Sequence, residues 1–138
     1  MISVRKQEVV KLEDVLHLYQ AVGWTNYTHQ PQMLEQALSH SLAIYLALDG
    51  DAVVGLVRLV GDGFSSVFVQ DLIVLPSYQR QGIGGALMKE ALGDFKDAYQ
   101  VQLVIDQTEK TLGFYRSLGF ETLSTYDCTG MIWLDRKK

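Results

Sequence analysis

The chain has 138 residues, 48% of them hydrophobic and 20% charged, with a formal net charge of −4 and a single cysteine. The acidic balance argues against a nucleic-acid binder, which carries a basic surplus, and one cysteine cannot form an internal disulfide. No apolar run approaches the ~20 residues of a membrane span, and the N-terminus has no secretion signal. We expect one cytoplasmic domain over residues 1–138, with no nucleic-acid or membrane partner.

The first part of the chain is expected to form a strand, two helices and a hairpin. Apolar residues recur at helical spacing after the first strand, and Gly23 lies where that helix should end. A polar-aromatic loop over 24–27 follows, and Pro31 suits the first turn of a second helix. Asp49-Gly50-Asp51 is a hairpin turn signal. The expected elements are a strand over 2–10, helices over 12–22 and 31–40, and strands over 42–48 and 52–60.

The second part of the chain contains the one expected crossover. After a turn at 61–63, the expected elements are a strand over 64–75, a helix over 82–96, a strand over 101–105, a helix over 109–118 and two strands within 121–134. A strand, a helix and a nearly all-apolar strand in succession predict a parallel, right-handed β-α-β unit. The fold class is therefore α/β, of the α+β type, with a mixed central sheet flanked by about four helices.

Three glycines, Gly82, Gly84 and Gly85, lie at the start of the expected 82–96 helix. Glycine costs about 0.8–1 kcal/mol relative to alanine in a helix interior. The first N–H groups of a helix have no partner inside it, and with the helix dipole they form an anion site. Missing Cβ atoms would let a phosphate approach them. The pattern predicts a cradle for a pyrophosphate.

Two common phosphate motifs do not fit this loop. A P-loop needs glycine followed by lysine and serine or threonine, whereas Ala86 follows Gly85. A dinucleotide fingerprint needs a third glycine at position 87, which is leucine.

The sequence QRQGIG at 79–84 resembles the acetyl-CoA signature, Q/R-x-x-G-x-G/A, of the Gcn5-related N-acetyltransferase (GNAT) family. Two further segments are similar to that family: DLIVLP at 71–76 to its central strand, and LGFYRSLGF at 112–120 to its FYxxxGF helix. Within the family, the chain looks most like the aralkylamine (serotonin-type) branch. The matches are short and lie at 58–63, at 70–74, at 112–116 (LGFYR) and at a late Gly-Met, 130–131.

The resemblance implies the GNAT fold, in which strands 4 and 5 splay apart and hold the pantetheine arm of acetyl-CoA between them. It implies acetyl-CoA as co-substrate and no metal. The arm would bond the backbone of the central strand, and a backbone N–H near Ile73 would hold the oxyanion. The implied cofactor-binding residues are Leu72, Ile73, Val74, Gln79, Arg80, Gln81, Gly82, Ile83, Gly84, Gly85 and Ala86.

Two residues are candidates for catalysis. By resemblance, the Tyr115 hydroxyl protonates the leaving thiolate, and the alternative is a core aromatic beside Phe114. Asp71 precedes the segment that would contact CoA. It either helps to remove the amine's proton or has a structural role, capping a strand bulge or pairing with Arg58. Asp106 is a rival base, although it better suits a cap for the following helix.

In this family, the early helices and the loop between them usually form one wall of the acceptor site, so the acceptor site is expected there. Trp24 and Tyr27 could stack on an aromatic amine or hold its ammonium, while the alternative for Trp24 is to staple the first helix to the core. His29 is a weak base candidate. The histidines lack metal-ligand spacing, and Cys128 is expected to be an inert core or strand thiol.

These observations lead to the expectation of an enzyme that transfers the acetyl group of acetyl-CoA to a primary amine of a small molecule by direct attack. The alternatives are a protein or peptide N-acetyltransferase and a non-catalytic acetyl-CoA-binding regulatory module. Many family members dimerise through their last strands, so the resemblance allows a homodimer, which nothing else in the sequence requires.

Overall fold

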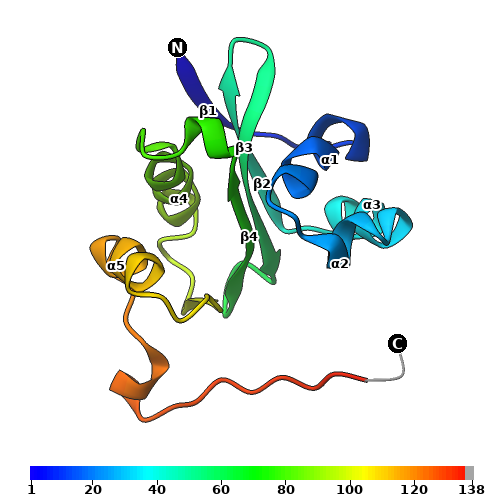
Figure 1. Ribbon diagram of the computed structural model, residues 1–138. Helices are drawn as coiled ribbons and strands as arrows, with labels where there is room; N and C mark the ends of the chain where they lie inside the picture. The colour runs from blue at the N-terminus through cyan, green and yellow to red at the C-terminus, as the bar shows by residue number, and fades with distance from the viewer. Residues whose placement is uncertain (136–138) are drawn as a thin grey trace. The chain divides into compact units, whose positions relative to one another are not determined.

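A computed structural model describes residues 1–135 of the chain. The chain divides into two compact units, Met1–Val104 and Ile105–Lys138, and each is described by itself. The first unit holds the sheet and four of the helices, and the second holds one helix (Figure 1). Within residues 1–135, no helix is long and apolar enough to cross a membrane.

The first unit is built on a five-stranded sheet with strand order β1-β2-β3-β4-β5. Neighbouring strands are antiparallel from β1 to β4, and β5 runs parallel to β4. The predicted mixed sheet with a single parallel crossover is therefore confirmed. The strands are β1 (Ile2–Lys6), β2 (Ala43–Asp49), β3 (Ala52–Gly61), β4 (Val67–Val74) and β5 (Val101–Leu103).

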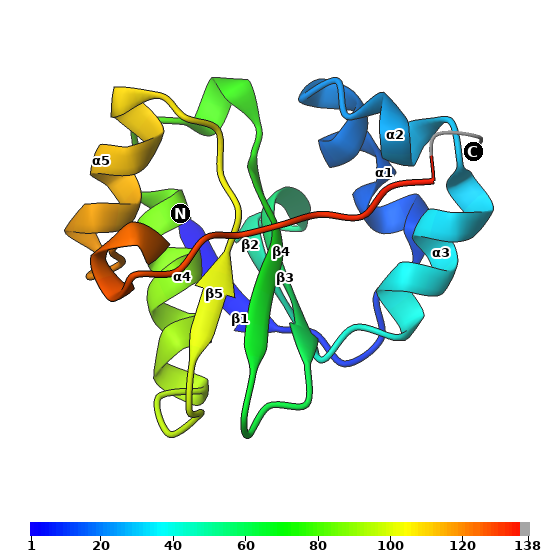
Figure 2. The ribbon, with the colours of Figure 1, turned by 90° about the horizontal axis from the view of Figure 1, so that it is seen from below.

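Helices cover both faces of this sheet. Figures 1 and 2 show α1, α2 and α3 on one side of it and α4 on the other. On the α1–α3 side, Leu18 and Leu34 are fully buried against sheet residues such as Leu56. On the other side, α4 buries Leu87 and Met88. The helices are α1 (Leu12–Ala21), α2 (Thr25–Thr28), α3 (Pro31–Ser39) and α4 (Ile83–Asp94), with a 3-10 turn, η1 (Pro76–Tyr78), before α4.

Strand β4 has two irregularities that matter for the site. Its register with β3 shifts between Arg58 and Leu59, so that Gln70 has no opposite residue and forms a bulge. Its pairing with β5 ends at Val69, opposite Leu103. Beyond Val69, β4 therefore runs on without a strand on the β5 side, as expected for two strands that splay apart.

The second unit contains α5 (Glu109–Ser117) and a 3-10 turn, η2 (Leu123–Tyr126). The hydroxyl of Thr108 accepts the N–H of Thr111 at 3.1 Å and caps α5, so the expectation that Asp106 forms this cap was wrong. Asp106 contributes its backbone carbonyl to the turn, which accepts the N–H of Thr108.

The two strands expected within 121–134 are absent, and this prediction was wrong. After η2, the described chain has no regular structure, and Met131, Ile132 and Trp133 are 96%, 81% and 82% exposed. A strand needs a partner to take its backbone hydrogen bonds, and no described segment pairs with this one. Cys128 lies here too, exposed rather than in a core or strand.

Smaller differences concern element ends. The expected loop over 24–27 contains the single helical turn α2, and the expected first strand stops at Lys6 instead of residue 10. Together with α2, the described residues contain five α-helices where about four were expected.

Candidate functional site

The loop that leads into α4 has a defined conformation. Gly82 is the N-cap residue, with φ 78° and ψ 9°, which is left-handed backbone that favours glycine. Arg80 also has a positive φ, 65°. The side-chain amide of Gln79 donates to the carbonyl of Val74 at 3.1 Å and ties the loop to the end of β4.

The first turn of α4 has free donors and open space. Helical bonding begins with the N–H of Ala86 to the carbonyl of Gly82 at 3.0 Å, which leaves the N–H groups of Ile83, Gly84 and Gly85 without a helical acceptor. No side chain caps the helix, and its first turn has no acidic residue. A Cβ at Gly85 would meet no atom within 4 Å. Packing therefore does not require glycine there, and the geometry fits a phosphate.

The end of β4 presents an open backbone edge. Leu72, Ile73 and Val74 pair with β3, but the pairing with β5 has already ended at Val69. On that side, no strand of the described chain takes the hydrogen bonds of these three residues. An open edge of this kind can bond an extended ligand as an added strand. Their contact with a pantetheine arm stays a prediction.

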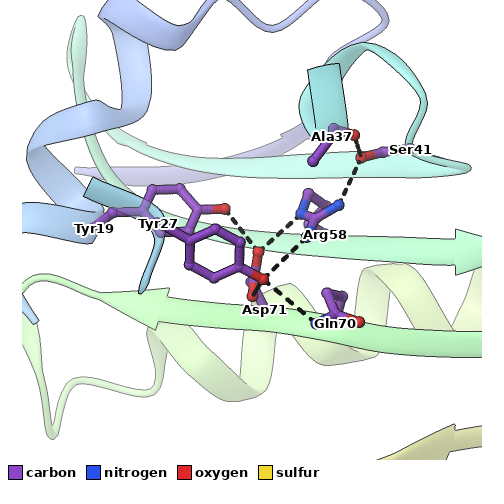
Figure 3. A network of polar contacts seen from close by, with 7 residues as sticks. All are labelled: Tyr19, Tyr27, Ala37, Ser41, Arg58, Gln70 and Asp71. Atoms are coloured by element: carbon purple, nitrogen blue, oxygen red, sulfur yellow. Dashed lines mark hydrogen bonds and ion pairs between the residues drawn. The ribbon is translucent and has the colours of Figure 1, made fainter. Parts of the chain in front are cut away.

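Asp71 and Arg58 form a buried ion pair on the α1–α3 side of the sheet (Figure 3). Arg58 Nε lies 2.8 Å from Asp71 Oδ2, and the two side chains are 5% and 2% exposed. The hydroxyl of Tyr19 donates to Oδ2 at 2.8 Å, and that of Tyr27 donates to Oδ1 at 2.9 Å. The predicted pairing of Asp71 with Arg58 is confirmed. The role of Asp71 as a base stays a prediction.

The remaining donors of Arg58 are also bound. Its Nη1 donates to Ser41 Oγ at 3.2 Å, and its Nη2 donates to Tyr27 Oη at 3.3 Å. Ser41 in turn donates to the carbonyl of Ala37 at 2.7 Å. Among the described residues, no buried side-chain nitrogen or oxygen lacks a partner. A fully bonded network in a low-dielectric interior holds its members in one arrangement.

The electrostatics of this network keep its phenols protonated. Burial raises the pKa of Tyr19 and of Tyr27, and the negative charge of Asp71 raises both further. Burial alone would lower the pKa of Arg58, but the adjacent carboxylate of Asp71 holds it above its usual value. At neutral pH, the two phenols are therefore donors and Arg58 is charged.

The two predicted substrate-binding aromatics lie in one cluster with Tyr19. Ring centroids are 6.1 Å apart for Tyr19 and Trp24, 5.0 Å for Tyr19 and Tyr27, and 6.4 Å for Trp24 and Tyr27. Trp24 is half-buried and packs against the core, which agrees with the structural alternative, and its contact with a substrate stays a prediction. Tyr27 is only 7% exposed, and the Arg58 guanidinium lies over its ring, 6.0 Å from the centroid. The contact of Tyr27 with a substrate likewise stays a prediction.

Tyr115 belongs to the second unit, on α5. Its ring makes edge contacts with Phe114 and Phe120, at centroid distances of 4.9 and 5.8 Å. Burial raises the pKa of Tyr115 above the ordinary value for tyrosine. The side chain is thus held in an aromatic cluster and keeps its proton at neutral pH. Its role toward the thiolate stays a prediction.

Other candidate groups do not gather into a site. His17 bonds the carbonyl of Val53 at 2.8 Å, and His29 is exposed. In the described part of the chain, no group of histidine, cysteine and carboxylate side chains could hold a metal ion. A cavity of about 680 Å³ lies between the start of α1 and strands β1–β3, but no predicted site residue lines it.

Sequence reasoning missed three side chains of the network, namely Tyr19, Ser41 and Gln70. Tyr19 was expected only as part of the apolar face of the first helix, although a buried tyrosine needs a partner for its hydroxyl. Gln70, whose amide donates to Tyr27 Oη at 3.4 Å, is placed there by the bulge in β4. A strand bulge beside Asp71 was among the alternatives offered by the sequence, but nothing in the sequence pattern placed Gln70 in it.

The comparisons with known proteins agree with this geometry. The family model described as an acetyltransferase (GNAT) domain matches residues 7–133. The structure of a GNAT-family acetyltransferase from Streptococcus pneumoniae TIGR4 is 81% identical, covers 99% of each chain and superposes with a TM-score of 0.91. A structure from Staphylococcus aureus, titled a probable acetyltransferase of unknown function, is 25% identical with a TM-score of 0.81, and it covers 98% of this chain and 100% of that one.

Curated relatives include plant enzymes. Serotonin N-acetyltransferase 2 of Oryza sativa is 32% identical over 66% of this chain and 48% of its own length. GCN5-related N-acetyltransferase 1 of Arabidopsis thaliana is 29% identical over 84% of this chain and 59% of its own length. The chain thus spans about half the length of these curated relatives.

Proposed function

The chain belongs to the acetyltransferase (GNAT) domain family, a family of acyl-CoA-dependent N-acetyltransferases, and we propose that it transfers the acetyl group of acetyl-CoA to a primary amine of a small molecule. The observation that carries this proposal is the first turn of α4. Its N–H groups lack helical acceptors, and a Cβ at Gly85 would meet only open space. Membership of the family implies acetyl-CoA as the donor.

The binding roles follow from the two open features of the first unit. The N–H groups at the start of α4, from Ile83 to Gly85, bind the pyrophosphate. The backbone edge of Leu72, Ile73 and Val74 bonds the pantetheine arm as an added strand. A backbone N–H near Ile73 stabilises the oxyanion of the tetrahedral intermediate. The thioester of acetyl-CoA supplies an activated acetyl group and a thiolate leaving group.

The reaction needs a neutral amine. An alkylamine with a pKa of about 10.4 is almost wholly protonated at pH 7, and reaching its neutral form costs about 4–5 kcal/mol. Its nitrogen then forms a bond to the acetyl carbon, and the bond from carbon to sulfur breaks. The thiolate takes the phenol proton of Tyr115, whose pKa is raised by burial.

The proton that the nitrogen loses is assigned to Asp71. This carboxylate is 2% exposed, and both its oxygens already accept hydrogen bonds. A direct contact with an amine is therefore blocked, and the proton travels through the Tyr27 hydroxyl, which passes its own proton to Asp71 Oδ1.

The cytoplasm is the proposed compartment, and a homodimer is a proposed assembly.

The test is turnover of acetyl-CoA with a panel of amines, measured as released CoA thiol. The panel contains tryptamine, serotonin, tyramine, spermidine, an aminoglycoside and a lysine peptide. We expect a small amine to be acetylated, and a preference for aryl amines would agree with the serotonin N-acetyltransferase among the relatives. Turnover of the lysine peptide alone would contradict the small-molecule assignment. Binding of acetyl-CoA without any turnover would point to a regulatory module.

A further inference from the structure

The Tyr27 hydroxyl is a hub at which three side chains meet (Figure 3). It donates to Asp71 Oδ1 at 2.9 Å and accepts from Arg58 Nη2 at 3.3 Å and from Gln70 Nε2 at 3.4 Å. A phenol has one proton to donate and two lone pairs to accept with, so all its positions are filled. The three partners differ in exposure, because Asp71 and Arg58 are buried and Gln70 is exposed.

The bulge in β4 is the reason that Gln70 reaches this hub. In a regular strand, neighbouring side chains point to opposite faces of the sheet. Gln70 has no opposite residue in β3, and its side chain and that of Asp71 both reach Tyr27. Bulges re-aim side chains in this way and are common next to active sites. The ion pair with Arg58 is complete without Gln70.

The position of Gln70 along β4 links the hub to the donor site. Gln70 is the first residue of β4 beyond its pairing with β5, which ends at Val69. The open edge proposed to bind the pantetheine arm, Leu72 to Val74, follows directly. A group bound at the hub would therefore lie at the beginning of that edge.

We propose that the amide nitrogen of Gln70 occupies, in the free protein, the place of the substrate's amine nitrogen on the Tyr27 hydroxyl. An amine N–H is a hydrogen-bond donor like the amide N–H, so it can replace Gln70 on the same lone pair of the phenol. Gln70 is exposed and its bond to Tyr27 is the longest at the hub, so this is the partner that exchanges.

The charges around the hub favour a neutral amine. The carboxylate of Asp71 is already paired with the guanidinium of Arg58, and the guanidinium itself contacts Tyr27 Oη. The hub therefore offers a protonated amine no unpaired negative charge. A neutral amine binds by donating one N–H to Tyr27, which leaves its lone pair free to attack. This inference rests on the proposed function and adds the acceptor contact to it.

The test compares three variants with the amine of the panel that is turned over fastest. Gln70→Ala removes the competing donor, and we expect the KM for the amine to fall about two- to fivefold with kcat unchanged. Tyr27→Phe removes the hub and the proposed proton relay, and we expect that KM to rise about tenfold and kcat to fall as well. In the double variant, Gln70→Ala should no longer lower KM, because the two residues act on one hydrogen bond.

Tyr19→Phe is the matched control. It also removes a phenol that donates to Asp71, at 2.8 Å, but Tyr19 is 0% exposed and out of reach of a substrate. We expect its KM for the amine to stay within twofold of the parent. Urea unfolding of all variants, and their affinity for acetyl-CoA, separate loss of fold from loss of the amine contact.

Two results would overturn the inference alone. One is an equal rise in KM for Tyr19→Phe and Tyr27→Phe, which would give both phenols a purely structural role. The other is a rise in KM for Gln70→Ala, which would make Gln70 a substrate contact. Absence of turnover with every amine would instead overturn the proposed function, and this inference with it.

Discussion

The buried network around Asp71 and the glycine turn at the start of α4 are both polar, yet they differ in completeness. Every buried polar side-chain atom of the described chain has a partner, and Asp71 alone accepts from Tyr19, Tyr27 and Arg58. At the start of α4, the N–H groups of Ile83 to Gly85 have no helical acceptor and no capping side chain. In the free protein the network is complete, whereas the N–H groups of the turn are left free for the pyrophosphate that we propose binds there.

Because of this difference, we expect the two regions to respond differently to mutation. A change at Arg58 or Tyr19 removes a partner from the buried charge of Asp71, so it should act mainly on stability, whereas a change at Tyr27 should also weaken the proposed contact with the amine. A change in the turn removes nothing that the fold uses, so it should act mainly on binding of acetyl-CoA.

The largest effect on turnover should come from a residue outside both regions. We expect Tyr115→Phe to lower kcat about 10²- to 10⁴-fold, the usual range for a general acid, with little change in affinity for acetyl-CoA. Burial raises the pKa of Tyr115, so its protonated form persists at neutral pH. In the pH profile of kcat, the decrease caused by deprotonation of this tyrosine should therefore lie above about pH 10. Steady-state kinetics across pH measure both.

The control for this change is Tyr126→Phe, in the same unit, where the hydroxyl is exposed and bonds Glu121 at 2.9 Å. It should retain the parent kcat. Normal kcat in Tyr115→Phe, or a large loss of acetyl-CoA affinity, would remove the acid role.

The largest effect on stability should come from the network. Arg58→Met leaves Asp71 buried without its cation, and breaking a buried pair costs about 3–5 kcal/mol. Urea unfolding followed by circular dichroism measures this loss. Arg5→Met, on the exposed part of β1, should change the unfolding free energy by less than about 0.5 kcal/mol. A similar small loss for Arg58→Met would mean that the pair does not support the fold.

The largest effect on binding should come from the turn. We expect Gly85→Asp to weaken acetyl-CoA binding about 100-fold or more, because it places a carboxylate where the pyrophosphate is proposed to bind. Calorimetric titration gives the affinity. Gly93→Asp is the matched control, since it lies in the same helix and its Cβ also meets open space. Equal affinity in the two variants would place the phosphates elsewhere.

The smallest effect should distinguish Gly85, whose Cβ position is open space, from Gly82, whose backbone is left-handed. Gly85→Ala should raise the unfolding free energy by about 0.4–1 kcal/mol, because alanine fits there and reduces the freedom of the unfolded chain. Gly82→Ala should lower it by about 1–2 kcal/mol, since its φ of 78° is left-handed. Loss of stability in Gly85→Ala would show that the fold itself needs this glycine.

Much of the fold could be predicted because local patterns and global structure agree. Gly23, Gly50 and Gly82 all adopt the positive φ expected of helix ends and turns, and the order of elements from β1 to α5 follows from apolar spacing. The last two expected strands failed for a different reason. Met131 to Leu134 are apolar, but strand formation depends on a partner edge, which a sequence pattern does not supply.

The candidate site could be predicted only where a motif carries it. The glycines of the α4 turn lie within four positions of the sequence, so a phosphate site there could be proposed from the sequence, and it stays a prediction. The network joins Tyr19, Tyr27, Arg58 and Asp71 across up to 52 positions of the chain, and it depends on one bulge at Gln70. The sequence offered the pairing of Arg58 with Asp71 as an alternative. It did not predict that the hydroxyls of Tyr19 and Tyr27 donate to Asp71.

An amide NMR titration of the ¹⁵N-labelled chain with acetyl-CoA would show directly which backbone N–H groups bind the ligand. We expect the largest shifts at the N–H groups of Ile83, Gly84 and Gly85 and along Leu72 to Val74, with little change at the Arg58 Nε–H, which is already bonded to Asp71. Saturable shifts confined to another surface, with the α4 turn unmoved, would contradict the account.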